Sequence, residues 1–301
     1  MTGFDTLLVV GGGLIGSSIA RAAKEYGQSK TIFMIDTSPS VCEALKRLSI
    51  ADDASADGSE FAAQADLIIL AVPPAKMGDA AAAIIPHMKP GAVLSDVGSV
   101  KGSVIKQITP HLRSDIHFVP GHPIAGTENS GPEAGFAGLF QERWMVLTPE
   151  EETTPASQAL KSFWEGLGSQ VIFMDAKRHD IVLATTSHVP HLIAFTLVGT
   201  ALDMETVTNN EVVKFSAGGF RDYTRLAASD PVMWRDVFID NKESVLEVVD
   251  RFIEDLSALK RAIRWDDGEH LTKQFAKTRN IREKIVEAGQ ETAAPNFGRD
   301  D

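Results

Sequence analysis

Short apolar runs alternate with stretches of helical periodicity over the first 120 residues of the chain. The runs are Thr6–Val10, Thr31–Ile35, Asp66–Val72, Ala92–Ser95 and Ile116–Val119. They are apolar almost throughout, as expected for strands that are covered on both faces. The helical stretches between them are Leu14–Tyr26, Pro39–Leu48, Met77–Ile85 and Lys101–His111. Strands that alternate with helices predict a doubly wound, mainly parallel α/β sheet.

The pattern changes in the second half of the chain. Residues 121–149 are rich in Gly and Pro, and a helix and a strand are predicted after them, at Ala156–Leu167 and Gln170–Met174. From about residue 176 almost everything is helical, with breaks at Gly218-Gly219 and Asp230-Pro231. We therefore predict a nucleotide domain at 1–175, an all-α domain at 176–290 and a flexible tail at 291–301.

One stretch, Ile181–Leu202, is apolar enough to resemble a membrane span. It carries His188, Pro190 and His191 in its middle, so we expect a helix buried in protein rather than in lipid. The apolar run at Leu7–Val10 leads into a glycine turn instead of a cleavage site, so no signal peptide is predicted.

The net charge and the cysteine content limit which classes of partner the protein can bind and indicate its cellular compartment. The formal net charge of the 301 residues is −12, whereas a nucleic-acid binder needs a basic face. Cys42 is the only cysteine, so neither an internal disulfide nor a thiolate metal site is expected. A soluble cytoplasmic protein fits these features best.

A glycine loop follows the first predicted strand. Gly11, Gly13 and Gly16 satisfy G-x-G-x-x-G, in which the first glycine permits the turn, the second admits a pyrophosphate and the third allows close packing of helix on strand. Leu14 and Ile15 open the following helix, whose N-terminus offers free N–H groups to phosphate. Alone, the motif also fits an ordinary glycine turn.

The context of the loop favours a Rossmann site for NAD. Asp36 ends the second predicted strand, where its carboxylate can accept both ribose hydroxyls and would repel a 2′-phosphate. The alternative is that Asp36 is a solvated surface carboxylate beside an ordinary glycine turn. Val72 and Pro73 end the next main strand and are expected to border the cofactor.

Polar, glycine-bearing strings follow the later strands. Ser99 lies in the string after the Ala92–Ser95 run, and His122 in the string after Ile116–Val119. Ligands of open α/β sheets bind beyond the carboxyl ends of strands, so both residues are expected near the nicotinamide. A histidine there can act as a general base, although a purely structural His122 is the alternative.

The helical half adds two histidines and two arginines. A metal site at His188 and His191 is disfavoured, because Pro190 distorts the turn and no other ligand is near. His188 can equally be a satisfied core histidine, and His191 a substrate contact. Arg221 and Arg225 are four residues apart, so on a helix they would share a face, either as solvated ion pairs or as a carboxylate clamp.

Taken together, these strings resemble the prephenate dehydrogenase family, which includes cyclohexadienyl and arogenate dehydrogenases. The resemblance covers about residues 6–265 in the family's order. The strings are GGLIGSS at Gly12–Ser18, DVGSVK at Asp96–Lys101, GHPIAGTENSG at Gly121–Gly131, SHVPH at Ser187–His191 and GGFRDYTRLAASDPVMWRD at Gly218–Asp236.

The resemblance implies an NAD-dependent oxidative decarboxylation of prephenate to 4-hydroxyphenylpyruvate, with arogenate as an alternative substrate, on the route to tyrosine. His122 matches the catalytic histidine, Ser99 the serine that orients it, and Arg225 the arginine that holds a carboxylate. The other implied substrate-side residues are Ser187, His191, Thr127, Glu128, Arg221 and Asp222. The family often has Lys where this chain has Arg221, a departure that keeps the charge.

The family also implies a homodimer through the C-terminal helices, with some pocket residues supplied by the partner subunit. No chorismate mutase or ACT domain is expected beside the predicted elements. Two other readings stay open from the residues alone: a β-hydroxyacid-type dehydrogenase, whose catalytic-lysine motif is not found here, and a non-catalytic NAD-binding sensor.

Overall fold

The computed structural model describes residues 3–127, 129–208 and 211–287. Contacts divide the chain into two units, Met1–Val245 and Leu246–Asp301. The first unit contains both sheets and all of the candidate site, so its architecture decides where the functional side chains lie. The predicted division near residue 175 stays a prediction.

The main sheet has six parallel strands in the order β3-β2-β1-β4-β5-β6. This strand order is that of the Rossmann fold, so the predicted fold class is confirmed. The bounds are β1 (Thr6–Val10), β2 (Thr31–Ile35), β3 (Asp53–Ser55), β4 (Leu67–Leu70), β5 (Val93–Asp96) and β6 (His117–Val119).

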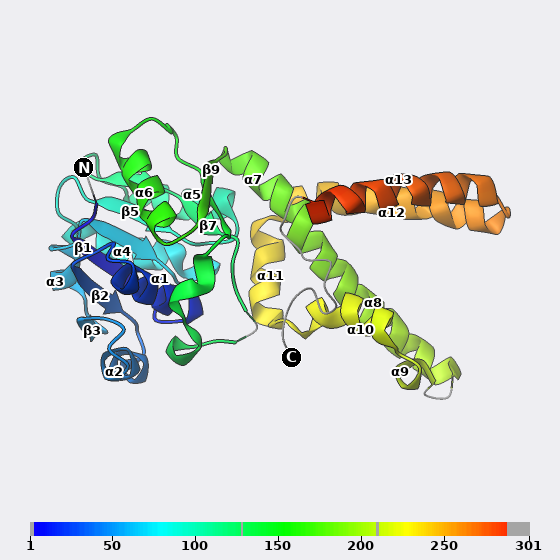
Figure 1. Cartoon of the computed structure of the whole chain (residues 1–301), viewed down its shortest axis with the longest axis horizontal. Coiled ribbons are helices and arrows are strands. Elements are labelled where there is room, and N and C mark those ends of the chain that lie inside the picture. Colours follow the sequence, from blue (N-terminus) through cyan, green and yellow to red (C-terminus); the bar gives the residue numbers. More distant parts are fainter. Residues whose placement is uncertain (1–2, 128, 209–210, 288–301) are drawn as a thin grey trace. The chain divides into compact units, whose positions relative to one another are not determined.

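Helices cover both faces of this sheet (Figure 1). Leu7 and Val9 of β1 belong to the same core as Ile19 of the first helix, whereas Leu8 and Val10 belong to a second core with Met77. The alternation follows from the period of two along a strand. The helices are α1 (Leu14–Glu25), α2 (Pro39–Arg47) and α6 (Pro155–Gly166), which add to the first core, and α3 (Ser59–Ala62), α4 (Met77–Ile84) and α5 (Lys101–Ile108), which add to the second.

A smaller sheet follows, made of β7 (Gly121–Pro123), β8 (Trp144–Leu147) and β9 (Gln170–Phe173). β7 is antiparallel to β8 and β8 is parallel to β9. His122 pairs with Val146 in this sheet, so the predicted catalytic histidine is held in a strand and not in a loop. Single-turn 3₁₀ segments lie at Pro74–Lys76 (η1), Ile85–His87 (η2), Thr109–His111 (η3), Pro132–Ala134 (η4) and Ala137–Phe140 (η5).

The rest of the first unit is helical. A long helical stretch begins with α7 (Ala176–Leu183), passes through a π-helical turn at Ala184–His188 (η6) and continues as α8 (Val189–Thr208). The following helical segments are α9 (Glu211–Lys214), α10 (Gly218–Thr224), the 3₁₀ turn η7 (Arg225–Ala228) and α11 (Pro231–Asp240).

The burial expected for the apolar stretch is wrong for its second half. Among the described residues, one helical stretch, Ala176–Met204, is long and apolar enough to cross a membrane by length and composition, and only 28% of its most apolar window is buried. His188 and Ala194 are buried, but Leu197 and Leu202 are exposed. The two histidines lie in the part that packs against protein, whereas Leu197 and Leu202 are left uncovered by the part of the first unit that the structure describes.

The second unit consists of α13 (Gly268–Glu287) and most of α12 (Lys242–Arg264). Large apolar side chains are exposed on both helices, among them Leu256, Ile263 and Ile281. The predicted tail from residue 291 lies outside the described residues.

Candidate active site

The glycine loop has the geometry of a dinucleotide cradle. Gly11 has φ +110°, and a Cβ there would lie 2.4 Å from the carbonyl oxygen of Ala71. A Cβ on Gly16 would lie 1.9 Å from the Gly11 carbonyl oxygen, so both positions require glycine. A Cβ on Gly13 would meet nothing within 4 Å, which leaves open space in front of the loop.

The N-terminus of α1 is free to bind an anion. The helix has no side-chain cap and no acidic residue in its first turn, so the N–H groups near Leu14 and Ile15 are not satisfied by capping. Asp36, directly after β2, accepts hydrogen bonds from the Gly12 N–H at 2.8 Å and the Ser38 N–H at 2.9 Å. The carboxylate therefore lies at the loop, where the sequence predicted it.

Several candidate residues gather at the carboxyl edge of the main sheet. Val72 and Pro73 follow β4, Ser99 follows β5, and His122 lies just beyond β6. Pro73 is exposed, and Val72 and Ser99 are partly buried. The predicted contact between Ser99 and His122 is not made, since the Ser99 hydroxyl has no hydrogen-bond partner among the described residues.

His122 is joined to a second histidine and a carboxylate that the sequence analysis did not single out. Its Nδ1 lies 2.8 Å from Nε2 of His179, and Nδ1 of His179 lies 2.8 Å from Oδ1 of Asp180. Asp180 in turn accepts hydrogen bonds from the N–H groups of Lys101 and Gly102, each at 2.8 Å. The residues of α7 thus tie His122 to the first turn of α5.

A buried ion pair lies beneath these histidines. Lys101 and Asp96 are fully buried, and the Lys101 ammonium donates hydrogen bonds to the Asp96 carboxylate and the Gly121 carbonyl. Asp96 also accepts from the N–H groups of Gly98 and Gly121. The pair fixes the end of β5 against the start of β7, one residue before His122.

Burial makes the histidines of this region neutral near pH 7. Desolvation lowers the pKa of His122 well below its ordinary value of 6.5, and the nearby His179, Lys101 and His188 lower it further. Burial also lowers the pKa of His179, against the opposing pull of Asp180. A neutral imidazole can accept a proton, which is the property that a general base needs.

His188 and His191 have separate environments. His188 is buried and its Nδ1 accepts from the Asn241 amide at 3.1 Å, which bears out the core-histidine alternative. His191 donates from Nδ1 to the Ser187 carbonyl at 2.9 Å and stacks on Trp234. Among the described residues, no group of three or more His, Cys, Asp or Glu side chains is placed to hold a metal ion.

The charged residues predicted for the substrate side are exposed. Arg225 lies close enough to His191 to lower the pKa of that imidazole, after the larger effect of burial. Arg221 lies on α10 with its Nε 3.9 Å from Asp222 Oδ1, and the structure does not bring these two to His122 by any hydrogen bond. Thr127 is exposed and accepts from the Asn129 N–H, while Glu128 lies outside the described residues.

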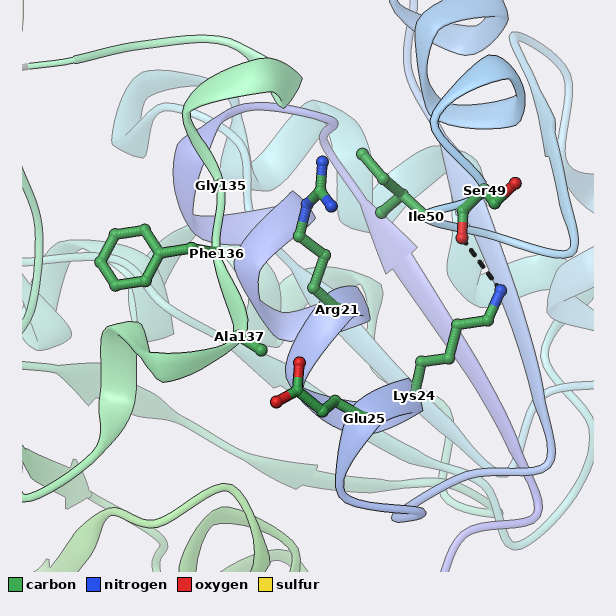
Figure 2. A pocket seen from close by; sticks show the side chains of 8 residues that line it. All are labelled: Arg21, Lys24, Glu25, Ser49, Ile50, Gly135, Phe136 and Ala137. Atoms are coloured by element: carbon green, nitrogen blue, oxygen red, sulfur yellow. Dashed lines mark hydrogen bonds between the residues drawn. The ribbon is translucent and has the colours of Figure 1, made fainter.

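A separate cavity of about 400 Å³ lies beside the second half of α1. Figure 2 shows Arg21 between Ile50 and the segment from Gly135 to Ala137, with Lys24 donating to the Ser49 carbonyl. Its lining residues are Arg21, Lys24, Glu25, Ser49, Ile50, Gly135, Phe136 and Ala137. None of them is a predicted site residue.

The contributors that sequence reasoning missed share one property: their partners are distant along the chain. His179 and Asp180 stand in an ordinary helical stretch. Trp234 lies within the last matching string and Asn241 five residues after it, and neither carries a pattern that singles it out. Only the segment Ala184–His188 leaves a structural sign, because π-helical turns often occur at functional sites.

Known proteins resemble this chain over nearly its whole length. A family model for the prephenate dehydrogenase nucleotide-binding domain matches residues 19–173, and one for the prephenate dehydrogenase dimerization domain matches residues 175–277. A cyclohexadienyl dehydrogenase of Zymomonas mobilis is 42% identical over 94% of this chain and 96% of its own length. A prephenate dehydrogenase of Bacillus subtilis is 34% identical over 97% of this chain and 79% of its own length.

A solved structure gives the same result. The prephenate dehydrogenase of Aquifex aeolicus, crystallised with hydroxyphenyl propionate and NAD⁺, superposes with a TM-score of 0.87 at 33% identity. The alignment covers 93% of this chain and 98% of that one.

Proposed function

This chain belongs to the prephenate dehydrogenase family, and from that premise we propose that it oxidises prephenate with NAD⁺, releasing CO₂ and forming 4-hydroxyphenylpyruvate. The observation that carries the proposal is the position of His122 at the carboxyl edge of the main sheet, beyond the glycine loop and within a hydrogen-bonded chain that keeps one ring nitrogen available.

The cofactor half of the site fits NAD⁺, which supplies the pyridinium that accepts hydride. Gly13 leaves room for the pyrophosphate at the uncapped N-terminus of α1, with Leu14 and Ile15 in its first turn, and Gly11 and Gly16 permit the close packing of the loop behind it. Asp36, whose carboxylate lies at the glycine loop, would accept the ribose hydroxyls, and Val72 and Pro73 would border the cofactor. The Aquifex aeolicus relative binds NAD⁺, which supports this assignment.

The catalytic step requires a base at the ring hydroxyl. In our proposal His122 Nε2 takes the proton of the C4 hydroxyl as hydride leaves C4. The C1–carboxylate bond then breaks to release CO₂, its electrons make the ring aromatic, and the proton returns to the phenol oxygen. Ser99, at the same edge of the sheet, would orient the C4 hydroxyl.

The anionic ends of the substrate need cationic or neutral donors. Arg225 supplies the guanidinium for a carboxylate, and it lies near His191, which Ser187 holds in place. Arg221, Asp222 and Glu128 would form a charged network around the pocket, with Thr127 as a further substrate-side residue. This assignment of substrate-side residues rests on the family's motifs.

The preference between prephenate and arogenate turns on one substituent, a keto group in the former and an amino group in the latter. Neither His191 nor Ser187 is a carboxylate that would attract the ammonium of arogenate. We therefore propose prephenate as the preferred substrate and arogenate as the weaker one.

We further propose a homodimer in the cytoplasm, with residues 1–175 binding the cofactor and residues 176–290 forming the substrate and dimerisation domain. A dimerization-domain match over 175–277 supports this assignment. The exposed Leu197 and Leu202 on α8 are apolar surface that a second copy would cover.

The test is NADH formation with prephenate, arogenate and 6-phosphogluconate in parallel. We expect the highest kcat/KM with prephenate. His122→Asn should keep NAD⁺ affinity and lower kcat by about 10²- to 10⁴-fold, the contribution of one acid–base group. His117→Asn, which changes an exposed histidine of β6, should leave kcat unchanged. Turnover of none of the three substrates, or near-normal kcat in His122→Asn, would contradict the proposal.

A further inference from the structure

His122, His179 and Asp180 form a continuous line of hydrogen bonds. The two imidazole rings meet edge to face, with centroids 5.1 Å apart and planes inclined by 66°. The bond between the rings and the bond from His179 to Asp180 are both 2.8 Å long. His179 is fully buried and Asp180 nearly so, so water does not compete for these bonds.

The direction of each hydrogen bond follows from Asp180. Its two oxygens accept the N–H groups of Lys101 and Gly102 at the start of α5, and a carboxylate is an acceptor only, so the bond with His179 is one that His179 donates. The proton of His179 is therefore on Nδ1, and its Nε2 carries a lone pair. That lone pair requires a proton on Nδ1 of His122, which leaves Nε2 of His122 as the basic nitrogen.

We propose that His179 and Asp180 are positioning residues that hold His122 in its Nδ1–H tautomer and stabilise the imidazolium formed when Nε2 takes the substrate proton. This inference rests on the proposed role of His122 as the base. It adds to the proposed function a second histidine that touches neither substrate nor cofactor.

The charges around His122 agree with this role. The Lys101 ammonium, which faces the histidines from α5, is neutralised by its ion pair with Asp96. His188 faces them from η6 and is neutral, because its Nδ1 accepts from Asn241. One negative charge, that of Asp180, is then left in the buried cluster, and a proton on His122 balances it through His179.

Substitution of His179 separates positioning from mere packing. His179→Phe keeps a ring of similar size but neither accepts from His122 nor donates to Asp180. We expect kcat to fall about 100-fold, the effect of a misplaced catalytic group, while NAD⁺ affinity and the KM for prephenate stay within about threefold. His179→Gln, whose amide oxygen can still accept from His122 Nδ1–H, should recover part of the loss.

Two further readouts distinguish the proposal from a structural role. In His179→Gln the acidic limb of kcat/KM should move, because the group that accepts from His122 Nδ1–H changes from an imidazole to an amide. In the double variant His122→Asn/His179→Phe, kcat should equal that of His122→Asn alone, because His179 acts only through His122. The proposal is overturned if the acidic limb of kcat/KM does not move in His179→Gln. It is also overturned if the kcat of the double variant is lower than that of His122→Asn by the factor that His179→Phe causes alone.

The outcomes also separate this inference from the proposed function. Near-normal kcat in His122→Asn removes the base assignment itself, whereas a slow His122→Asn beside a fast His179→Phe removes only the positioning role. If His179→Phe does not fold, ¹⁵N-histidine NMR of the wild-type protein decides. Both rings must then be Nδ1–H tautomers, and an Nε2–H signal for either overturns the inference.

Discussion

The imidazole of His191 lies nearly flat on the indole of Trp234, with ring centroids 3.7 Å apart and planes inclined by 23°. The histidine comes from α8 and the tryptophan from α11, and the Ser187 carbonyl fixes the same imidazole through Nδ1. The ring is thus held on one face and at one edge, and Nε2 keeps a defined direction. Trp234 itself is buried beside Val100 and Val237.

The stack predicts a binding defect when the indole is removed. Trp234→Leu should raise the KM for prephenate about 3- to 10-fold, since aromatic stacking contributes about 1 kcal/mol beyond buried area, and should change kcat less. Trp234→Phe should keep most of the affinity. Steady-state kinetics with both variants checks this, and equal KM values for Leu, Phe and wild type would show that His191 needs no support.

His188 predicts a pH dependence of stability. Burial lowers its pKa from 6.5 to about 4, so the folded protein resists protonation that the unfolded chain accepts. Above pH 6.5 both states are neutral and the stability is complete. As the pH falls from 6.5 towards 4, the unfolded state binds the proton first, and about 3 kcal/mol of unfolding free energy is lost.

Denaturation by urea at pH 7 and pH 4.5, at one protein concentration, measures this effect. His188→Asn should be less stable than wild type at pH 7 and should lose less on acidification. His87→Asn, which changes an exposed histidine, should follow the wild-type curve. Parallel curves for His188→Asn and wild type would count against the assignment.

Sequence patterns predicted the fold better than the interior of the site. Strands β1 and β2 were predicted to the residue, because uninterrupted apolar runs are typical of covered parallel strands. The strand β3, at Asp53–Ser55, and β7, at Gly121–Pro123, were missed because each is short and not apolar.

The buried ion pair predicts a large difference between two lysines. Lys101→Met leaves the Asp96 carboxylate buried without its cation and should cost about 3–5 kcal/mol of unfolding free energy. Lys89→Met removes a partner of Asp66 in a pair that is one-third exposed, and should cost less than about 1 kcal/mol. Chemical denaturation of both variants measures the two losses of unfolding free energy. Similar losses for Lys101→Met and Lys89→Met would contradict the prediction.

Asp36 predicts the choice of dinucleotide. Asp36→Ser removes the carboxylate that would bind the ribose hydroxyls and that accepts from Gly12, so the KM for NAD⁺ should rise about tenfold or more, as for loss of a charged hydrogen bond. The ratio of kcat/KM for NADP⁺ to that for NAD⁺ should rise as well. Asp52→Ser, which removes a similar bond to the Ile32 N–H, should leave this ratio unchanged. An unchanged ratio in Asp36→Ser would exclude Asp36 from cofactor recognition.

The exposed half of α8 predicts the oligomeric state. Leu202 is 68% exposed in the single chain, so Leu202→Glu places a charge where we propose that a second copy packs. We expect wild type to sediment as a dimer and Leu202→Glu to shift towards monomer. Ile172→Glu, at a 40% exposed residue of β9, serves as the control and should remain dimeric. A wild-type monomer at micromolar concentration would refute the dimer.

The candidate site was predictable where one segment carries the chemistry and unpredictable where two segments meet. Gly11, Gly16 and Asp36 follow from local turn geometry and a strand end, and the structure places them as expected. The bond between His122 and His179 joins residues 57 positions apart, and no local pattern encodes it. The same holds for the stack of Trp234 on His191.

The π-helical turn at Ala184–His188 separates two halves of the site along one continuous helix. His179 lies before it and faces His122, whereas His191 lies after it and faces Trp234. A π turn holds one residue more than the α-helical turn it replaces. Loss of that residue would rotate everything downstream by about 100°, and His191 would leave its indole while His179 kept its place. The stretch between these two histidines should therefore accept neither a single-residue deletion nor a single-residue insertion.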